Sequence, residues 1–236
     1  MKVCLVTGIT GTLGSELTET LKSNDYFVIG LSRKIWVNAD ACITCDFTNL
    51  STNDLKESIN NVISNLKEIN QIDFVHCAGY YEKERKFDSE FNESLCEKTF
   101  SINVFSFYKI VNILTEICEK YKVKSSVVAV SSNLTIKKNT LTAPYISSKI
   151  ALEGMVQSFA QTYGSLDMRF NCVCPGMFAS NMNEYNVPEQ FINNTPLKRL
   201  GKVDDIIDSI MFLLSDKSNC ITANKLVVDG GGSNGY

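Results

Sequence analysis

The chain has 236 residues, of which 44% are hydrophobic and 21% charged, with a formal net charge of −3. This balance is that of an ordinary soluble globular protein, and the length allows one α/β domain with a large core or two small domains. No apolar run approaches the ~18 residues of a membrane span, and the charge shows no bias toward nucleic acid.

Short apolar runs alternate with longer stretches of helical periodicity. Strands are predicted at 2–6, 27–32, 41–45, 72–77, 126–131, 169–174 and 225–228. Helices are predicted at about 13–23, 51–68, 93–119, 145–163 and 203–215. Repeated β-α units with continuous apolar strands indicate an α/β fold with a parallel, doubly wound (Rossmann) sheet covered on both faces. Because no repeat, linker or composition break interrupts the pattern, we expect a single domain over 1–236.

The first predicted strand ends in a glycine-rich turn that passes directly into a helix. Glycine permits a tight turn and lets the backbone approach a phosphate, and the helix N-terminus supplies N–H groups for a pyrophosphate. The turn falls at the first β-to-α junction within residues 1–32, as dinucleotide binding requires. The candidate cofactor-binding residues here are Gly8, Thr10, Gly11, Thr12, Leu13 and Gly14.

The end of the second strand bears on which nicotinamide cofactor is bound. An acidic residue there would accept hydrogen bonds from a ribose 2′-hydroxyl, whereas a basic residue suits a 2′-phosphate. The chain has Ser32-Arg33-Lys34 and no acid, and arginine is a planar, always-charged donor. NADP(H) is therefore favoured over NAD(H), the alternative being that Arg33 and Lys34 are solvated loop charges.

The crossover between the second and third strands is short. Only about eight residues, 33–40, are available, whereas a crossover helix normally needs a dozen or more. We therefore expect a loop there. Asp46 and Phe47 follow the third strand, where ligands bind in open sheets, so Asp46 could accept from an adenine amino group or could cap the next helix.

The nine cysteines are an odd number and lie mostly in apolar runs. Cys42 and Cys45 have metal-like spacing, but no second Cys or His pair follows and the chain has a single histidine, so no metal site is predicted. Buried reduced thiols, together with an N-terminus that lacks the long apolar region of a signal peptide, predict a cytoplasmic location.

A tyrosine and a lysine stand four residues apart in Tyr145-Ile-Ser-Ser-Lys149, with Ser132 thirteen residues upstream. Positions i and i+4 share a helix face, so the phenol and the ammonium can point into one cleft. The ammonium favours the phenolate and is expected to lower the pKa of Tyr145 from its reference value of about 10. Such a tyrosine would donate and accept protons near neutral pH.

Together these features resemble the short-chain dehydrogenase/reductase family over essentially the whole chain. The glycine turn resembles the family's cofactor turn, and Asp46 matches its acidic residue at the adenine. The other segments that resemble its cofactor site are Cys77-Ala78-Gly79 on the fourth strand and Pro175-Gly176 with Met177, Phe178 and Ser180 near the nicotinamide. Leu200-Gly201 and Asp229-Gly230-Gly231 look like C-terminal signatures of the family.

The resemblance also implies a catalytic set: Asn103, Ser132, Tyr145 and Lys149. It implies that Tyr145 exchanges a proton with a carbonyl or alcohol oxygen as hydride moves, and that Ser132 holds that oxygen. Lys149 would tune the tyrosine and bind the cofactor ribose, and Asn103 would hold a helix bend or a relaying water.

Two features depart from the family pattern. The glycine spacing, with Gly11 rather than a glycine at Thr12, is that of an extended, epimerase-like branch, whereas the length and C-terminal part resemble the short, ketoacyl reductase-like branch. His76 and Cys77 replace both asparagines of the strand-four motif. We expect a structural role for His76, because Tyr145 already supplies acid–base chemistry.

The resemblance predicts an NADP(H)-dependent oxidoreductase that interconverts a ketone and a secondary alcohol on a small molecule. Residues 177–198 are expected to close its substrate pocket. One alternative is a 3-oxoacyl-(acyl-carrier-protein) reductase, for which Lys122 and Lys124 could meet an acidic carrier. Others are a non-catalytic NADP-sensing binding protein and an epimerase or dehydratase. In the family that the chain resembles, the long helices that correspond to 93–119 and 145–163 usually pack between subunits, so the resemblance implies a homodimer or homotetramer.

Overall fold

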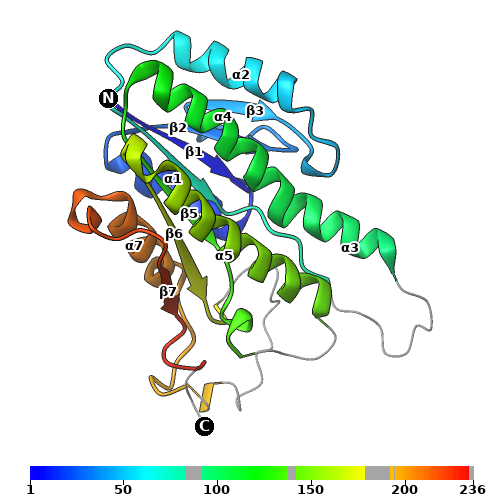
Figure 1. Cartoon of the computed structure of the whole chain (residues 1–236). Coiled ribbons are helices and arrows are strands. Elements are labelled where there is room, and N and C mark those ends of the chain that lie inside the picture. Colours follow the sequence, from blue (N-terminus) through cyan, green and yellow to red (C-terminus); the bar gives the residue numbers. More distant parts are fainter. Residues whose placement is uncertain (83–91, 138–141, 179–191, 194, 234–236) are drawn as a thin grey trace.

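In the computed structural model, seven strands form one parallel sheet (Figure 1). The structure describes residues 1–82, 92–137, 142–178, 192–193 and 195–233. The strands are β1 (Lys2–Thr7), β2 (Tyr26–Ser32), β3 (Ala41–Thr44), β4 (Gln71–His76), β5 (Ser125–Val130), β6 (Met168–Pro175) and β7 (Lys225–Val228). Each predicted strand is confirmed to within one residue at either end. Their nearly continuous burial is what a sheet covered on both faces requires.

The strand order is β3-β2-β1-β4-β5-β6-β7, and every neighbouring pair is parallel. The order therefore reverses between β1 and β4, which is the switch point of a doubly wound sheet. The predicted fold class is confirmed. Residues 33–40 contain no helix, so the expected loop crossover from β2 to β3 is confirmed too.

The described helices are α1 (Thr12–Ser23), α2 (Thr52–Ser64), α3 (Glu93–Phe100), α4 (Ser106–Tyr121), α5 (Ala143–Tyr163) and α7 (Val203–Leu214). The prediction for 51–68 was too long at its C-terminal end. There Asn65 donates its side-chain amide to the Asn61 carbonyl at 2.7 Å, and Leu66 N–H bonds to Ile63. Such local bonds compete with helix continuation, and a left-handed Glu68 turns the chain toward β4.

The predicted helix 93–119 is two helices joined by a π turn, Ser101–Phe105. A π turn inserts one residue into the helical repeat and is frequent at functional sites. Hydrophobic periodicity does not reveal it, because the apolar residues on either side still face the sheet. Asn103 lies within this turn and is fully buried.

Helices cover the sheet on both faces (Figure 1). α2, α4 and α5 pack on one face in a core that includes Phe74, Phe107 and Phe170. α1 and α7 pack on the other face in a second core, and Trp36 of the crossover loop is partly buried against this second core. Within the described ranges, no helix is long and apolar enough to cross a bilayer.

Candidate active site

A cavity of about 830 Å³ opens at the carboxyl edge of the sheet. This is where ligands bind in doubly wound folds, and the volume is in the range of small-molecule sites. It is lined from the ends of β1, β2, β4, β5 and β6. Every predicted cofactor-binding residue that the structure describes lines it; Ser180 lies outside the described residues.

The glycine turn after β1 is shaped by backbone contacts that a side chain would obstruct. Gly8 has a positive φ of 67°, and a Cβ there would lie 2.8 Å from the backbone nitrogen of Ala78. A Cβ on Gly14 would lie 2.3 Å from the Gly8 carbonyl oxygen. Gly11 is the N-cap of α1 and offers no side chain to the first N–H groups of the helix. This cradle fits a pyrophosphate at the helix N-terminus.

His76 ties the glycine turn to the end of β4. Its Nδ1 lies 2.9 Å from the Thr7 hydroxyl, which also accepts a hydrogen bond from the Ala78 N–H at 3.1 Å. Burial lowers the pKa of His76 to about 3, so the ring is uncharged at neutral pH. It packs against Phe74 and Phe107. These contacts agree with the structural role expected for His76.

At the adenine end predicted from the sequence, Ser32, Arg33, Asp46 and Phe47 all line the cavity. Asp46 accepts from the N–H and the hydroxyl of Thr48 at 2.9 and 2.8 Å, and these bonds lower the pKa of its carboxyl. Asp46 therefore caps the short 3₁₀ turn Phe47–Asn49 and also faces the cavity, so the two interpretations of this residue are compatible.

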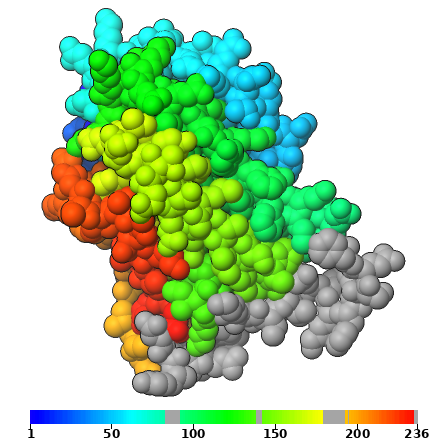
Figure 2. All heavy atoms as spheres, in the orientation of Figure 1, coloured from blue at the N-terminus to red at the C-terminus, as the bar shows by residue number. Residues whose placement is uncertain are grey.

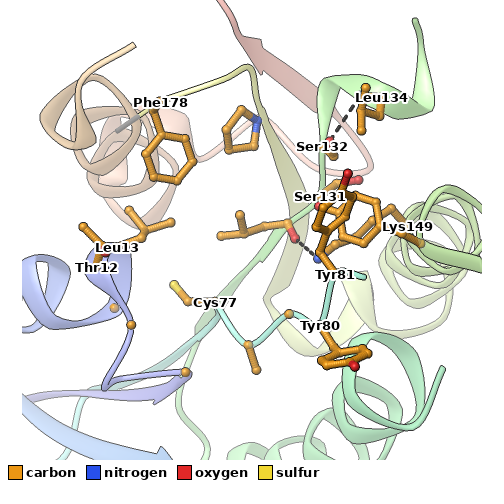
Figure 3. Close-up of a pocket in the computed structure, with 18 of the residues that line it drawn as sticks. Thr12, Leu13, Cys77, Tyr80, Tyr81, Ser131, Ser132, Leu134, Lys149 and Phe178 are labelled. Carbon is orange, nitrogen blue, oxygen red and sulfur yellow. Dashed lines mark hydrogen bonds between the residues drawn. The ribbon is translucent and has the colours of Figure 1, made fainter. Parts of the chain in front are cut away.

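Tyr145 and Lys149 lie one turn apart near the start of α5, and the Lys149 ammonium is 5.7 Å from the centre of the Tyr145 ring. The ammonium donates to the Val130 carbonyl at 2.8 Å (Figure 3). Burial lowers the pKa of Lys149 to about 8. Ser132 is the N-cap of the turn Asn133–Thr135, and its hydroxyl lowers the pKa of the Tyr145 phenol.

The expected lowering of the tyrosine pKa is wrong for the protein alone. Burial raises the pKa of Tyr145 to about 12, and the hydrogen bond from Ser132 offsets only part of that rise. The sequence argument counted the lysine charge and left out desolvation, which disfavours the phenolate. At neutral pH the phenol therefore holds its proton.

Asn103 lies behind this cavity and does not line it. Its Oδ1 accepts from the Tyr80 N–H at 2.7 Å, and its Nδ2 donates to the Tyr80 carbonyl at 3.1 Å and to the Ser148 hydroxyl at 2.9 Å. Asn103 thus joins the π turn to the segment after β4 and to α5. The structure places it in an irregular helix, as the predicted helix bend requires.

Tyr80 and Tyr81 also line the cavity, and the sequence prediction missed them (Figure 3). Tyr81 meets the Tyr145 ring edge-on, with ring centres 5.1 Å apart. The ammonium of Lys98 lies 4.0 Å from the centre of the Tyr80 ring. Their place in the segment that follows the carboxyl end of β4 was a usable signal, because that edge carries ligand contacts. Nothing in the local sequence marks Lys98 or Lys137, which line the cavity as well.

β6 ends at Pro175, and Gly176 follows it beside Asp229: a Cβ on Gly176 would lie 2.5 Å from the Asp229 Cβ. Met177 and Phe178 follow and line the cavity. Most of the expected closing segment, 179–191 and 194, lies outside the described residues. Among the residues that are described, no group of three or more His, Cys, Asp or Glu side chains could hold a metal ion.

Comparison with known proteins gives a consistent family. A family model described as enoyl-(acyl carrier protein) reductase matches residues 31–233. An L-xylulose reductase of Caenorhabditis elegans is 30% identical over 143 residues, 58% of this chain and 57% of the relative. The chain thus spans just over half the length of the first curated relatives it matches. A 3-oxoacyl-(acyl-carrier-protein) reductase of Haemophilus influenzae is 29% identical over 241 residues, 98% of this chain and 97% of the relative.

The fold has close counterparts among solved structures. A short-chain dehydrogenase/reductase from Mycobacterium ulcerans superposes with a TM-score of 0.88 at 21% identity, over 100% of this chain and 90% of the other. At that identity the superposition shows the fold alone. The family match over 31–233 goes further: the chain belongs to the short-chain dehydrogenase/reductase family of NAD(P)-dependent oxidoreductases.

Proposed function

We propose that the chain interconverts a ketone and a secondary alcohol on a small molecule, using NADP(H). The observation that carries the proposal is the convergence of Ser132, Tyr145 and Lys149 in the cavity that also holds the glycine turn. Proton-transfer groups and a dinucleotide cradle in one cavity are what a hydride-transfer enzyme needs.

Each of the three residues has a distinct part in the proposed reaction. The bound nicotinamide supplies or accepts the hydride. Tyr145 gives its proton to the carbonyl oxygen in reduction, and Ser132, whose hydroxyl acts on the Tyr145 phenol, holds the same oxygen. Lys149 places a buried positive charge beside the phenol and favours the phenolate left behind. A phenol with a pKa of about 12 holds its proton at neutral pH, so Tyr145 is in the protonated form that the reduction of a carbonyl requires.

The substrate side of the proposed site combines an aromatic wall with polar groups. Tyr81 stands against Tyr145, and Asn133 and Lys137 line the cavity near Ser132. This mixture suits a small ketone with hydroxyl or carboxyl substituents. The similarity to an L-xylulose reductase supports a hydroxylated ketone as the first candidate.

A 3-oxoacyl-(acyl-carrier-protein) reductase is the second candidate, favoured by the nearly full-length similarity to the Haemophilus enzyme. The carrier-binding lysines expected from the sequence do not support it. Lys122 and Lys124 precede the amino end of β5, whereas the cavity opens at the carboxyl ends of the strands. Lys124 is paired instead with Asp216 at 2.5 Å.

A homo-oligomer in a reducing cytoplasm is also proposed. α4 and α5 lie side by side on the face seen in Figure 2. Large apolar side chains are exposed on them, namely Phe105 at the end of the π turn, Tyr108 and Ile150. Contiguous exposed apolar groups mark protein interfaces. The absolute mass by light scattering would give the number of subunits.

The function is tested by NADPH oxidation over a panel of L-xylulose, D-erythrulose and acetoacetyl-coenzyme A. Wild-type protein should oxidise NADPH with at least one of them. Tyr145→Phe should fold and bind NADPH with unchanged affinity, yet lose turnover by roughly 10²- to 10⁴-fold, the usual contribution of a general acid. Wild-type kcat in Tyr145→Phe would rule out the assigned acid. Tyr163→Phe, a tyrosine at the far end of the same helix, should keep wild-type kcat.

A further inference from the structure

Glu153 is a buried carboxylate on α5, one turn beyond Lys149 and two beyond Tyr145. It is 5% exposed and is not among the residues that line the cavity. A buried charge is costly unless it is paired and hydrogen-bonded, so its partners indicate what it does.

One oxygen of Glu153 binds the segment that carries Ser132. Oε1 accepts from the Ser131 hydroxyl at 2.6 Å and lies 2.7 Å from the Thr135 hydroxyl. Ser131 directly precedes Ser132, and Thr135 is the last residue of the turn that Ser132 caps. The Thr135 hydroxyl is also 2.9 Å from the Ser132 carbonyl, and the Ser132 hydroxyl accepts from the Leu134 N–H at 3.2 Å. Glu153 thus holds the turn at both ends.

The other oxygen of Glu153 is held from the opposite side. Oε2 lies 3.1 Å from the ammonium of Lys225 on β7. This hydrogen bond raises the pKa of Lys225. The carboxylate therefore lies between Lys225 of β7 and the two hydroxyls of the Ser131–Thr135 segment.

We propose that Glu153 is a positioning residue of the reaction: it fixes the Ser131–Thr135 turn on α5 and so aims the Ser132 hydroxyl at the oxygen that Tyr145 protonates. The proposal rests on the proposed function, since it acts through Ser132. Ser132 and Tyr145 come from different elements, and Glu153 hydrogen-bonds the turn from the helix that bears Tyr145 and Lys149.

A double-mutant cycle separates this role from a merely structural one, because residues that act as a unit are not additive. Glu153→Gln keeps the volume of the side chain but replaces the carboxylate with a neutral amide. That amide would face the hydroxyls of Ser131 and Thr135 and the ammonium of Lys225. With L-xylulose as the probe and NADPH as cofactor, it should lower kcat roughly 10- to 100-fold, the loss caused by a misplaced reacting group. The KM for NADPH should stay within about twofold. In a Ser132→Ala background the same change should cost no further turnover.

Two further variants serve as controls. Asp73→Asn alters another fully buried carboxylate, which accepts from Ser126, Tyr26 and Gln71 at the other end of the sheet. It should lower the melting temperature but keep wild-type kcat. Ser131→Ala combined with Thr135→Val removes the two hydroxyls that bind Glu153 and should lower kcat as much as Glu153→Gln does. This double variant tests the proposal even where Glu153→Gln does not fold.

Several outcomes would overturn the proposal. One such outcome is that Glu153→Gln lowers kcat by the same factor in the wild-type and Ser132→Ala backgrounds. Another is that Glu153→Gln lowers the melting temperature but keeps wild-type kcat. Either result would make Glu153 a structural residue while the proposed function stands. Wild-type kcat in Ser132→Ala alone would instead remove Ser132 from the proposed function, and this proposal with it. Crystal structures decide independently of the probe: the distance between the Ser132 and Tyr145 hydroxyl oxygens should lengthen in Glu153→Gln and stay unchanged in Asp73→Asn. An unchanged distance in Glu153→Gln would refute the proposal.

Discussion

The side-chain amide of Asn103 pairs with both backbone polar groups of Tyr80, accepting from its N–H at 2.7 Å and donating to its carbonyl at 3.1 Å. A side chain that satisfies a donor and an acceptor of one residue fixes the backbone of that residue in the way a strand partner would. Here Asn103 fixes the segment that follows β4, and Tyr80 and Tyr81 of this segment line the cavity.

Asn103→Asp should therefore disturb the site although Asn103 does not line it. The carboxylate would face the Tyr80 carbonyl, and the bond to the Ser148 hydroxyl would lose its donor. We expect a loss of about 1–3 kcal/mol in unfolding free energy, the cost of unsatisfied buried groups, and a lower kcat. Asn112→Asp, at a partly exposed position on α4, should change stability by less than about 0.5 kcal/mol. Urea unfolding of both variants tests this, and equal losses would contradict it.

The glycine turn should not tolerate even a methyl group. Gly14→Ala places a Cβ against the Gly8 carbonyl oxygen, and such overpacking costs about 1–3 kcal/mol. It should also weaken NADPH binding, which a fluorescence titration would measure. Gly154→Ala on α5 meets nothing within 4 Å and should stabilise the protein by about 0.5–1 kcal/mol. A Gly14→Ala protein with wild-type melting temperature and NADPH affinity would refute the assignment of this turn.

Arg33 should decide between the two nicotinamide cofactors. A hydrogen bond to a charged group is worth about 1.5–3 kcal/mol, so Arg33→Ala should raise the KM for NADPH roughly 10- to 100-fold. The KM for NADH, which lacks the 2′-phosphate, should change less than about twofold. Lys34→Ala is the matched control and should leave the ratio of the KM for NADPH to the KM for NADH unchanged. Steady-state kinetics with both cofactors give the answer, and parallel changes in the two KM values would exclude a 2′-phosphate contact.

The pH dependence of stability should reflect two buried groups on β4 that oppose each other. Burial raises the pKa of Asp73 to about 7, so the native state binds the extra proton above pH ~4 and this contribution to stability falls as the pH rises to 7. Burial lowers the pKa of His76 to about 3, so the unfolded state binds the extra proton up to pH ~6.5 and this contribution rises with pH.

Asp73→Asn removes the contribution to stability that falls as the pH rises and leaves that of His76. Its unfolding free energy should rise more steeply than that of the wild type between pH 4.5 and 6.5, by at most about 1.4 kcal/mol per pH unit. Urea titrations at four pH values measure the slopes. Asp208→Asn, an exposed position on α7, should keep the wild-type slope. Superimposable slopes for Asp73→Asn and wild type would contradict the assignment.

The sequence alone predicted the seven strands, the loop crossover at 33–40 and part of the cavity lining, including the glycine turn, Ser132, Tyr145 and Lys149. These depend on local patterns: apolar runs, glycine spacing and the i, i+4 relation of Tyr145 and Lys149. It did not predict the pKa of Tyr145, since desolvation depends on residues brought together from distant elements. Tyr81 and Glu153 were missed for the same reason, because their partners lie 64 and 22 residues away in the chain.

The π turn Ser101–Phe105 also limits how this chain could change its length. Deleting one residue there would give a regular helix, but each residue of an α-helix advances by about 100°. Everything before the deletion would rotate by that angle relative to α4, and Leu95 and Thr99 would leave the interior. Insertions and deletions between Glu93 and Tyr121 should therefore be excluded from functional variants of this protein, even where single substitutions are accepted.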